Sequence, residues 1–150
     1  MDSNSCEYTK GTLPGCAPLA LAYVPMQQSS KPAYPAQDAL KRGTLFPALD
    51  LPFMNNVNKD ALGNTPLAEL MALDFVCNEL ALYLDTHKDD KEAFETYKSF
   101  LKLAAEAQSK YVEKYGPVTH ADMADMGSFT WLSDPWPWNY SSDSSTQEAK

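Results

Sequence analysis

Two long helical stretches, residues 66 to 84 and roughly 90 to 115, constrain the fold more than any other feature of this sequence. The first stretch has few polar positions, so a helix there needs neighbours on most of its sides. In the second stretch, apolar and aromatic residues recur at steps of three and four between Lys and Glu, which is typical of a helix with one buried face. The short connection between them favours antiparallel packing. The sequence therefore predicts an all-α fold built on an antiparallel two-helix hairpin.

Local signals define where these helices begin and end. Thr65 is placed to cap the first helix, with Pro66 at its first position, where the missing N–H has no cost. Asp89 or Asp90 is placed to cap the second helix, and Gly116 followed by proline ends it. Between these signals, the first helix is expected to end near Asp85.

Residues 16 to 55 predict an extended arm rich in proline and aromatic residues. Seven of the eleven prolines fall at or near this stretch, which excludes long helices and central strands. Its apolar content is too high for a solvated linker, so the arm is expected to lie against another surface. Within it, residues 35 to 42 predict about two helical turns that end at Gly43.

The remaining segments complete the predicted organisation. Residues 1 to 15 form a flexible leader and residues 56 to 64 a polar linker. Residues 65 to 140 hold the hairpin and an irregular segment with all three tryptophans, and residues 141 to 150 form a disordered tail. Within residues 65 to 140, we expect loop or irregular turns from 118 to 127.

Charge and hydropathy exclude two classes of partner. The net charge is −8, and residues 61 to 150 account for all of it with 15 acidic and 7 basic residues. Such a surface repels nucleic acid. No apolar run approaches the roughly 18 residues that a membrane span requires, and the first residues do not resemble a signal peptide.

The three cysteines have no metal-ligand spacing. Cys77 falls in the apolar helix and is expected to be a small core residue. Together with the missing signal peptide, free thiols indicate synthesis in a reducing cytoplasm. Cys6 and Cys16 either stay reduced or pair later in an oxidising compartment.

Candidate catalytic residues do not form a motif. His87 has Asp85 and Asp89 nearby, and His120 has Asp122 and Asp125 nearby, but neither spacing fits a metal or acid–base site. No nucleophile set, phosphate-binding loop or Glu-x-x-His pair is present. We therefore expect no enzyme activity, no metal site and no cofactor.

The tryptophans indicate binding. Trp131, Trp136 and Trp138 lie within eight residues and are separated by prolines. A two-helix hairpin cannot bury all three, and tryptophan is enriched in interface hot spots. The alternative is that the tryptophans fold back over the core of the chain, and this alternative is strongest for Trp131.

Two groups of motifs resemble the spore coat families CotJA and CotJB. The strings LAYVPMQ (21–27) and ALKRGTLFPAL (39–49) resemble CotJA, with Met26 where that family carries an aromatic residue. The strings ELALYLDTH (79–87), YGPVT (115–119) and DPWPW (134–138) resemble CotJB. The chain is thus similar to a fusion of the two families in operon order. Fusion raises the local concentration of one module near the other.

The resemblance implies a non-catalytic component of the inner endospore coat, made in the mother-cell cytoplasm. It implies an adaptor that binds and positions a manganese-catalase-like coat protein, the CotJC-like product of the same operon. The docking residues are then those of the aromatic arm and the tryptophan segment: Tyr23, Leu45, Phe46, Phe53, Trp131, Trp136 and Trp138.

Two alternatives to this adaptor stay open at the level of sequence. One is a self-assembling coat polymer, a homo-oligomer built by exchange of arms between copies. The other is a metal-delivery subunit that binds manganese through His87, His120 and nearby carboxylates.

Overall fold

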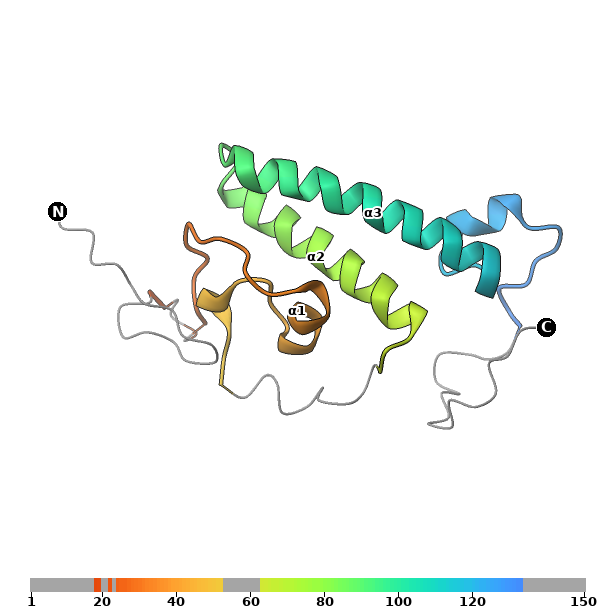
Figure 1. Cartoon of the computed structure of the whole chain (residues 1–150), viewed down its shortest axis with the longest axis horizontal. Helices are drawn as coiled ribbons and strands as arrows, with labels where there is room; N and C mark the ends of the chain where they lie inside the picture. Colours follow the sequence, from red (N-terminus) through yellow and green to blue (C-terminus); the bar gives the residue numbers. More distant parts are fainter. Residues whose placement is uncertain (1–17, 20–21, 23, 53–62, 134–150) are drawn as a thin grey trace. The chain divides into compact units, whose positions relative to one another are not determined.

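The computed structural model describes residues 18–19, 22, 24–52 and 63–133 (Figure 1). Along these residues the elements are the α-helices α1 (Ala36–Arg42), α2 (Pro66–Thr86) and α3 (Lys91–Tyr115) and the 3₁₀ helices η1 (Pro47–Leu49) and η3 (Ala121–Asp125). No strand occurs in the described residues, where Leu19 and Pro25 form an isolated antiparallel bridge. The chain divides into two units, residues 1–105 and 106–150. The predicted all-helical class is confirmed.

Helix α2 begins and ends at residues that satisfy its free backbone groups. The hydroxyl oxygen of Thr65 accepts a hydrogen bond of 3.1 Å from the backbone N–H of Ala68, which confirms the predicted cap. At the other end, the N–H of His87 donates to the carbonyl of Tyr83. The helix is 21 residues long and ends at Thr86, next to the predicted end near Asp85.

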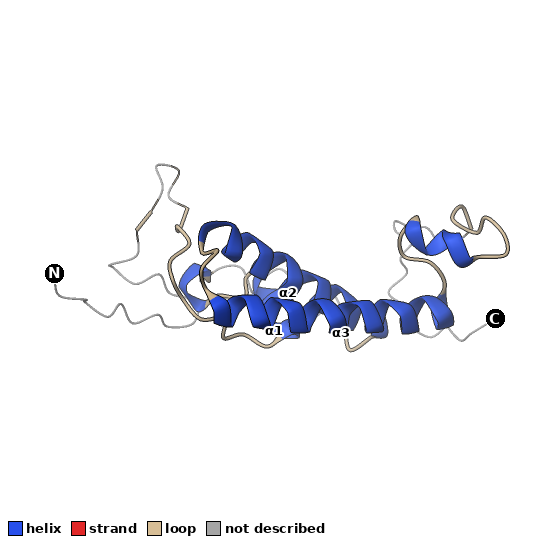
Figure 2. Cartoon of the chain, turned by 90° about the horizontal axis from the view of Figure 1, so that it is seen from above, coloured by secondary structure: helices blue, strands red, loops and turns tan. Residues whose placement is uncertain are grey.

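Helix α3 lies beside α2 and runs in the opposite direction from the turn that joins them (Figures 1 and 2). Of the two candidate caps, Asp90 fills the role, because its Oδ1 accepts a 3.0 Å hydrogen bond from the N–H of Ala93. At the other end, Gly116 adopts a φ of 101°, which glycine tolerates without the strain of a side chain. The predicted antiparallel hairpin is confirmed.

The arm packs on α2 within the same chain. Helix α1 ends at Gly43, whose φ of 76° and N–H bond to the carbonyl of Ala39 form a left-handed cap. Helix α1 lies against α2, and the chain after Gly43 passes along the same side of α2 (Figure 1). The apolar first helix therefore obtains two of its neighbours, the arm and α3, from its own chain.

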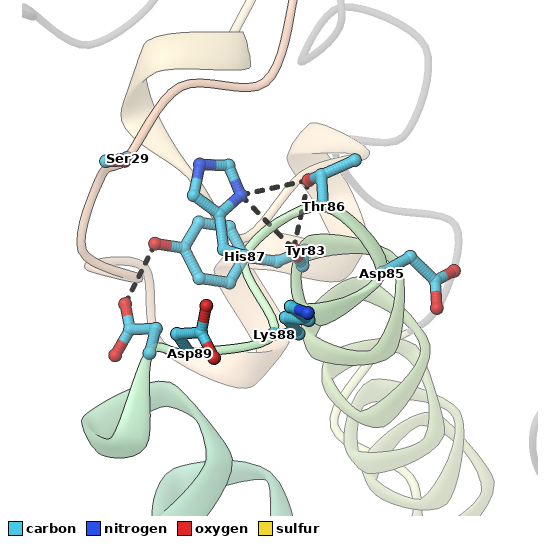
Figure 3. A pocket seen from close by; sticks show the side chains of 8 residues that line it. Ser29, Tyr83, Asp85, Thr86, His87, Lys88 and Asp89 are labelled. Carbon is cyan, nitrogen blue, oxygen red and sulfur yellow. Dashed lines mark hydrogen bonds between the residues drawn. The ribbon is translucent and has the colours of Figure 1, made fainter.

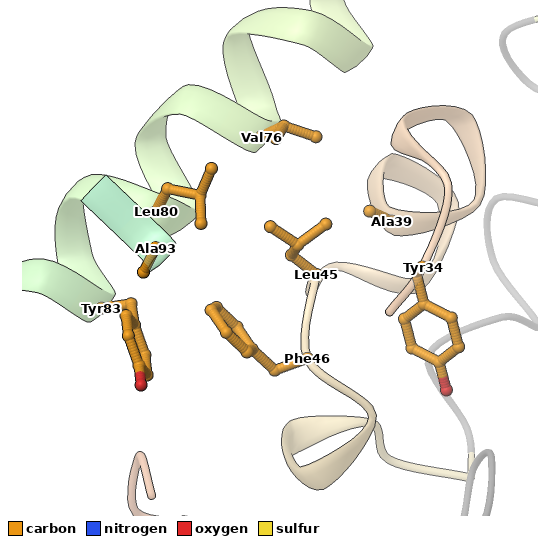
Figure 4. Close-up of a cluster of buried hydrophobic side chains, with 8 residues drawn as sticks. All are labelled: Tyr34, Ala39, Leu45, Phe46, Val76, Leu80, Tyr83 and Ala93. Atoms are coloured by element: carbon orange, nitrogen blue, oxygen red, sulfur yellow. The ribbon is translucent and has the colours of Figure 1, made fainter. Parts of the chain in front are cut away.

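The core lies where the arm, α2 and the start of α3 meet. Leu45 and Phe46 project from the arm toward α2 (Figure 4), and the Phe46 ring stacks on the Tyr83 ring with centroids 5.0 Å apart. Phe46 is 1% exposed. The fully buried members of this cluster are Tyr34, Ala39, Leu45, Phe46, Val76, Leu80, Tyr83 and Ala93. Since these residues come from both halves of the sequence, neither half holds this core alone.

A polar network closes the arm on itself. Asp50, which is 1% exposed, accepts a 2.6 Å bond from Arg42 and a 2.8 Å bond from the Tyr34 hydroxyl at the same carboxylate oxygen. The Arg42 guanidinium also lies over the Tyr34 ring at 4.9 Å. Burial, followed by the bond to Asp50, raises the pKa of Tyr34 to about 12. A buried carboxylate needs such a partner, since an unpaired buried charge is costly.

Two details differ from the sequence expectations. Cys77 is half-buried rather than a core residue, because it lies at the edge of the surface that α2 presents to its neighbours. The segment 118–127, expected to be irregular, contains the 3₁₀ helix η3.

No described helix is both long enough and apolar enough to cross a membrane.

Candidate functional site

An open pocket of about 530 Å³ lies at the turn between α2 and α3 (Figure 3). Ser29 of the arm lines it together with Tyr83, Asp85, Thr86, His87, Lys88, Asp89 and Asp90. Four residues of the Tyr-Leu-Asp-Thr-His motif line it, and so does Asp89, the second aspartate that lies near His87 in the sequence. The chemistry available here depends on whether these polar groups are free.

Tyr83 and Asp90 hold the turn together. The Tyr83 hydroxyl donates a 2.9 Å hydrogen bond to Oδ2 of Asp90, while Oδ1 of the same carboxylate caps α3. The N–H of Ala93 and the Tyr83 hydroxyl lower the pKa of Asp90. Burial, and then the bond to Asp90, raise the pKa of Tyr83. Both groups are thus kept in their ordinary charge states at neutral pH.

His87 and Thr86 are also engaged in local contacts. The Thr86 hydroxyl donates to the Tyr83 carbonyl at 3.1 Å. Nδ1 of His87 lies 2.9 Å from that hydroxyl and 3.3 Å from the same carbonyl, and its ring stacks on Tyr83 at 4.4 Å. These contacts terminate α2, which gives the Tyr-Leu-Asp-Thr-His motif a structural role as a helix stop.

His120 and Asp122 lie in the second unit and have structural contacts of their own. The His120 ring packs on Trp131 with centroids 4.3 Å apart. The Asp122 carboxylate accepts hydrogen bonds from the N–H groups of Val118 and Thr119 and from the Gln108 side chain. Although burial acts to raise the pKa of Asp122, these hydrogen bonds lower it.

The described residues contain no group of three or more His, Cys, Asp or Glu side chains that could hold a metal ion. His87 and His120 each lie in a local network of structural contacts. Within the described part of the chain, the polar groups at both histidines hold turns and helix ends.

The second candidate site is the contact between the arm and α2. Oε2 of Glu79 accepts two hydrogen bonds of 3.1 Å from the arm, one from the Thr44 hydroxyl and one from the N–H of Leu45. The Thr44 hydroxyl oxygen in turn accepts a bond from the N–H of Phe46. One carboxylate on α2 thus fixes the register in which the Gly-Thr-Leu-Phe-Pro motif enters the core.

The structure distributes the predicted docking residues over different environments. Leu45 is 4% exposed and Phe46 1%, and both contact α2 of the same chain. Trp131 is half-buried on His120 and is flanked by the exposed side chains of Phe129 and Leu132. Tyr23, Phe53, Trp136 and Trp138 lie outside the described residues.

Sequence reasoning missed the residues that join the arm to α2. Glu79 entered the sequence analysis only as part of the string that resembles CotJB, and Asp50 was not considered as a functional residue. Glu79 is a half-buried carboxylate in a helix that is mainly apolar, and such a residue is normally paired. That signal pointed to a partner but did not identify the Thr44 turn.

A docked arm on a helical hairpin, with exposed apolar side chains on both, is typical of a structural or binding protein. The chain belongs to the CotJB family, whose model, described as CotJB protein, matches residues 64–139. Residues 18–53 match the model described as Spore coat associated protein JA (CotJA). The chain is therefore a fusion of the two families, with CotJA first, and is a spore coat-associated protein. No curated protein and no solved structure matches it.

Proposed function

We propose that this chain is a non-catalytic adaptor that binds a manganese-catalase-like coat protein and positions it in the inner layers of the endospore coat. In this proposal the chain is made in the mother-cell cytoplasm and then joins the coat. The observation that carries the proposal is the shared core, in which Leu45 and Phe46 of the CotJA segment pack on α2 of the CotJB segment. Two coat modules thereby form one binding unit.

The contacts made by the polar side chains at the α2–α3 turn support a non-catalytic role. In the pocket at the α2–α3 turn, Tyr83, Thr86, His87 and Asp90 are occupied by hydrogen bonds or stacking contacts that define the helix ends. An acid–base catalyst needs a group that is free to reach a substrate proton. These contacts support a structural role for the Tyr-Leu-Asp-Thr-His motif at the turn.

Of the predicted docking residues, Leu45 and Phe46 lie in the core of the chain, so the proposed docking role passes to the others. Leu45 and Phe46 contribute by joining the two segments. We propose that the partner contacts Trp131, Trp136 and Trp138, and that it also contacts Tyr23 and Phe53. Phe129 and Leu132 are 68% and 63% exposed beside Trp131, and apolar patches of this kind mark interaction sites.

Co-expression with the catalase-like protein tests the proposal. We expect one complex in size-exclusion chromatography with light scattering, with manganese bound to the catalase-like partner. The double variant Trp136→Ala/Trp138→Ala should weaken the complex by tenfold or more, as expected for hot-spot residues, and should leave the melting temperature unchanged. Phe94→Ala, which removes an aromatic ring that is 47% exposed on α3, serves as the matched control and should bind normally.

Three outcomes contradict the proposal. They are the absence of any complex, equal binding by the tryptophan variant and the parent, and stoichiometric manganese on this chain when it is purified alone. The last outcome, lost in the double variant His87→Ala/His120→Ala, supports the metal-delivery alternative instead.

A further inference from the structure

The arm meets α2 through two buried side chains. Leu45 and Phe46 project toward three buried residues of that helix, which are Val76, Leu80 and Tyr83 (Figure 4). Buried aromatic anchors of this kind carry much of the binding energy in interfaces between separate proteins. Each of these contacts joins a residue at or before position 46 to one at or after position 76. None of them passes through the chain segment that links the arm to the hairpin.

The polar contacts at the same place recognise a particular backbone turn. Oε2 of Glu79 accepts one 3.1 Å bond from the Thr44 hydroxyl and another from the N–H of Leu45. The first bond requires a hydroxyl side chain and the second a backbone N–H next to it, so Glu79 selects a turn that begins with Thr or Ser. We call the surface that the arm contacts the arm-docking face; it consists of Val76, Glu79, Leu80 and Tyr83.

Contacts within the arm hold this turn in the conformation that α2 binds. The carbonyl of Leu45 accepts hydrogen bonds from the N–H groups of Ala33 and Tyr34, at 3.3 and 3.4 Å. The Thr44 hydroxyl oxygen accepts a 3.1 Å bond from the N–H of Phe46. A segment that is ordered by its own contacts loses less conformational freedom when it binds, which favours affinity.

Contacts within the hairpin hold the other side of the interface. The Tyr83 hydroxyl donates to Asp90 at 2.9 Å, and the Tyr83 ring stacks on His87 with centroids 4.4 Å apart. All three residues belong to the hairpin, so the aromatic surface that receives Phe46 is positioned by the hairpin itself.

The two sides also have opposite net charges. Residues 18–52 contain three basic and two acidic residues, whereas residues 64–115 contain six basic and ten acidic residues. Lys31 of the arm forms a 3.1 Å ion pair with Glu92 at the start of α3. Complementary charges of this kind steer two molecules into association.

We propose that the arm-docking face is a protein-binding site that works without the covalent link, and that it binds the Thr44–Phe46 turn when a separate chain presents it. The partner is a chain of the CotJA type, since the arm that fills the site matches that family's model. Covalent fusion then adds only a higher local concentration to an interface that already exists. The inference does not rest on the catalase-binding role.

Cleavage of the folded full chain tests the proposal. A protease recognition sequence replaces residues 55–60, and the folded chain is cut there. In size-exclusion chromatography with light scattering, the two fragments should elute together with the mass of the uncut chain. When isotopically labelled and unlabelled cut chains are mixed, native mass spectrometry should show complexes that pair a labelled arm with an unlabelled hairpin.

A variant tests whether the Thr44 turn is the recognised element. Thr44→Val keeps the shape of the side chain but removes its bond to a carboxylate, so the dissociation constant of the cut fragments, measured by dilution, should rise by about tenfold. Thr130→Val, the same change at an exposed position, should leave that constant unchanged. Far-UV circular dichroism of the uncut variants verifies that both keep their helices.

Three outcomes overturn the proposal. They are separation of the fragments after cleavage, failure of mixed cut chains to form labelled–unlabelled complexes, and equal dissociation constants for Thr44→Val and Thr130→Val. The first two need no substitution in the interface, so they decide the matter even if Thr44→Val fails to fold.

Discussion

Replacing Phe46 by alanine tests whether the arm and the hairpin share one core. Phe46 is 1% exposed and stacks on Tyr83, so the change removes a whole buried ring and leaves a cavity between the arm and α2. Core Phe→Ala changes cost about 3–5 kcal/mol, a large part of the roughly 5–15 kcal/mol that stabilises a domain. The ring contacts α2 over residues more than 30 positions away, so the loss should destabilise both segments together.

The assay is guanidinium unfolding followed by far-UV circular dichroism. At a slope of a few kcal/mol per molar, the midpoint for Phe46→Ala should fall by about 1 M. Phe94→Ala makes the same chemical change at a ring that is 47% exposed and should move the midpoint little. If the two variants unfold within about 1 kcal/mol of each other, the shared core is refuted.

Two further predictions concern the polar contacts. Glu79→Ala should lower the free energy of unfolding, measured in urea, by about 2–3 kcal/mol, because it removes a charged acceptor of two hydrogen bonds from the arm. The control is Glu106→Ala, at an exposed position on α3. Equal losses in the two variants would contradict the role of Glu79. The pKa of Tyr34 is raised from 10.0 to about 12 in the folded chain, so the unfolded chain loses this proton first as the pH rises. The free energy of unfolding should therefore fall between pH 10 and 12, by up to about 3 kcal/mol. Tyr34→Phe should lack this part of the fall, and identical pH profiles for the two proteins would contradict the assignment.

The docked arm explains why an almost entirely apolar helix exists in this chain. Helix α2 is surrounded by α1 and the Leu45–Phe46 turn on one side and by α3 on another. Its exposed residues include the apolar Leu67, Met71 and Leu82 and the polar Asp74 and Asn78. The pattern of burial on α2 thus follows its contacts with α1, with the arm and with α3.

The sequence by itself determined the helices and their ends. Thr65 caps α2 and Asp90 caps α3 through side-chain bonds to residues three positions away, and Gly43 ends α1 through its own left-handed backbone. Each of these signals acts within one helical turn, so the order of residues is sufficient to predict it. The local motifs also carried the resemblance to the two coat families.

The tertiary structure alone decided what the arm contacts and what the motifs do. Glu79 meets Thr44 across 35 positions of sequence, and Phe46 meets Tyr83 across a similar separation. Periodicity reports that a helix face is apolar but does not identify the residue that covers it. For this reason Leu45 and Phe46, predicted to dock a partner, were found packed on their own α2. His87, to which only the metal-delivery alternative gave a chemical role, lies at a helix end.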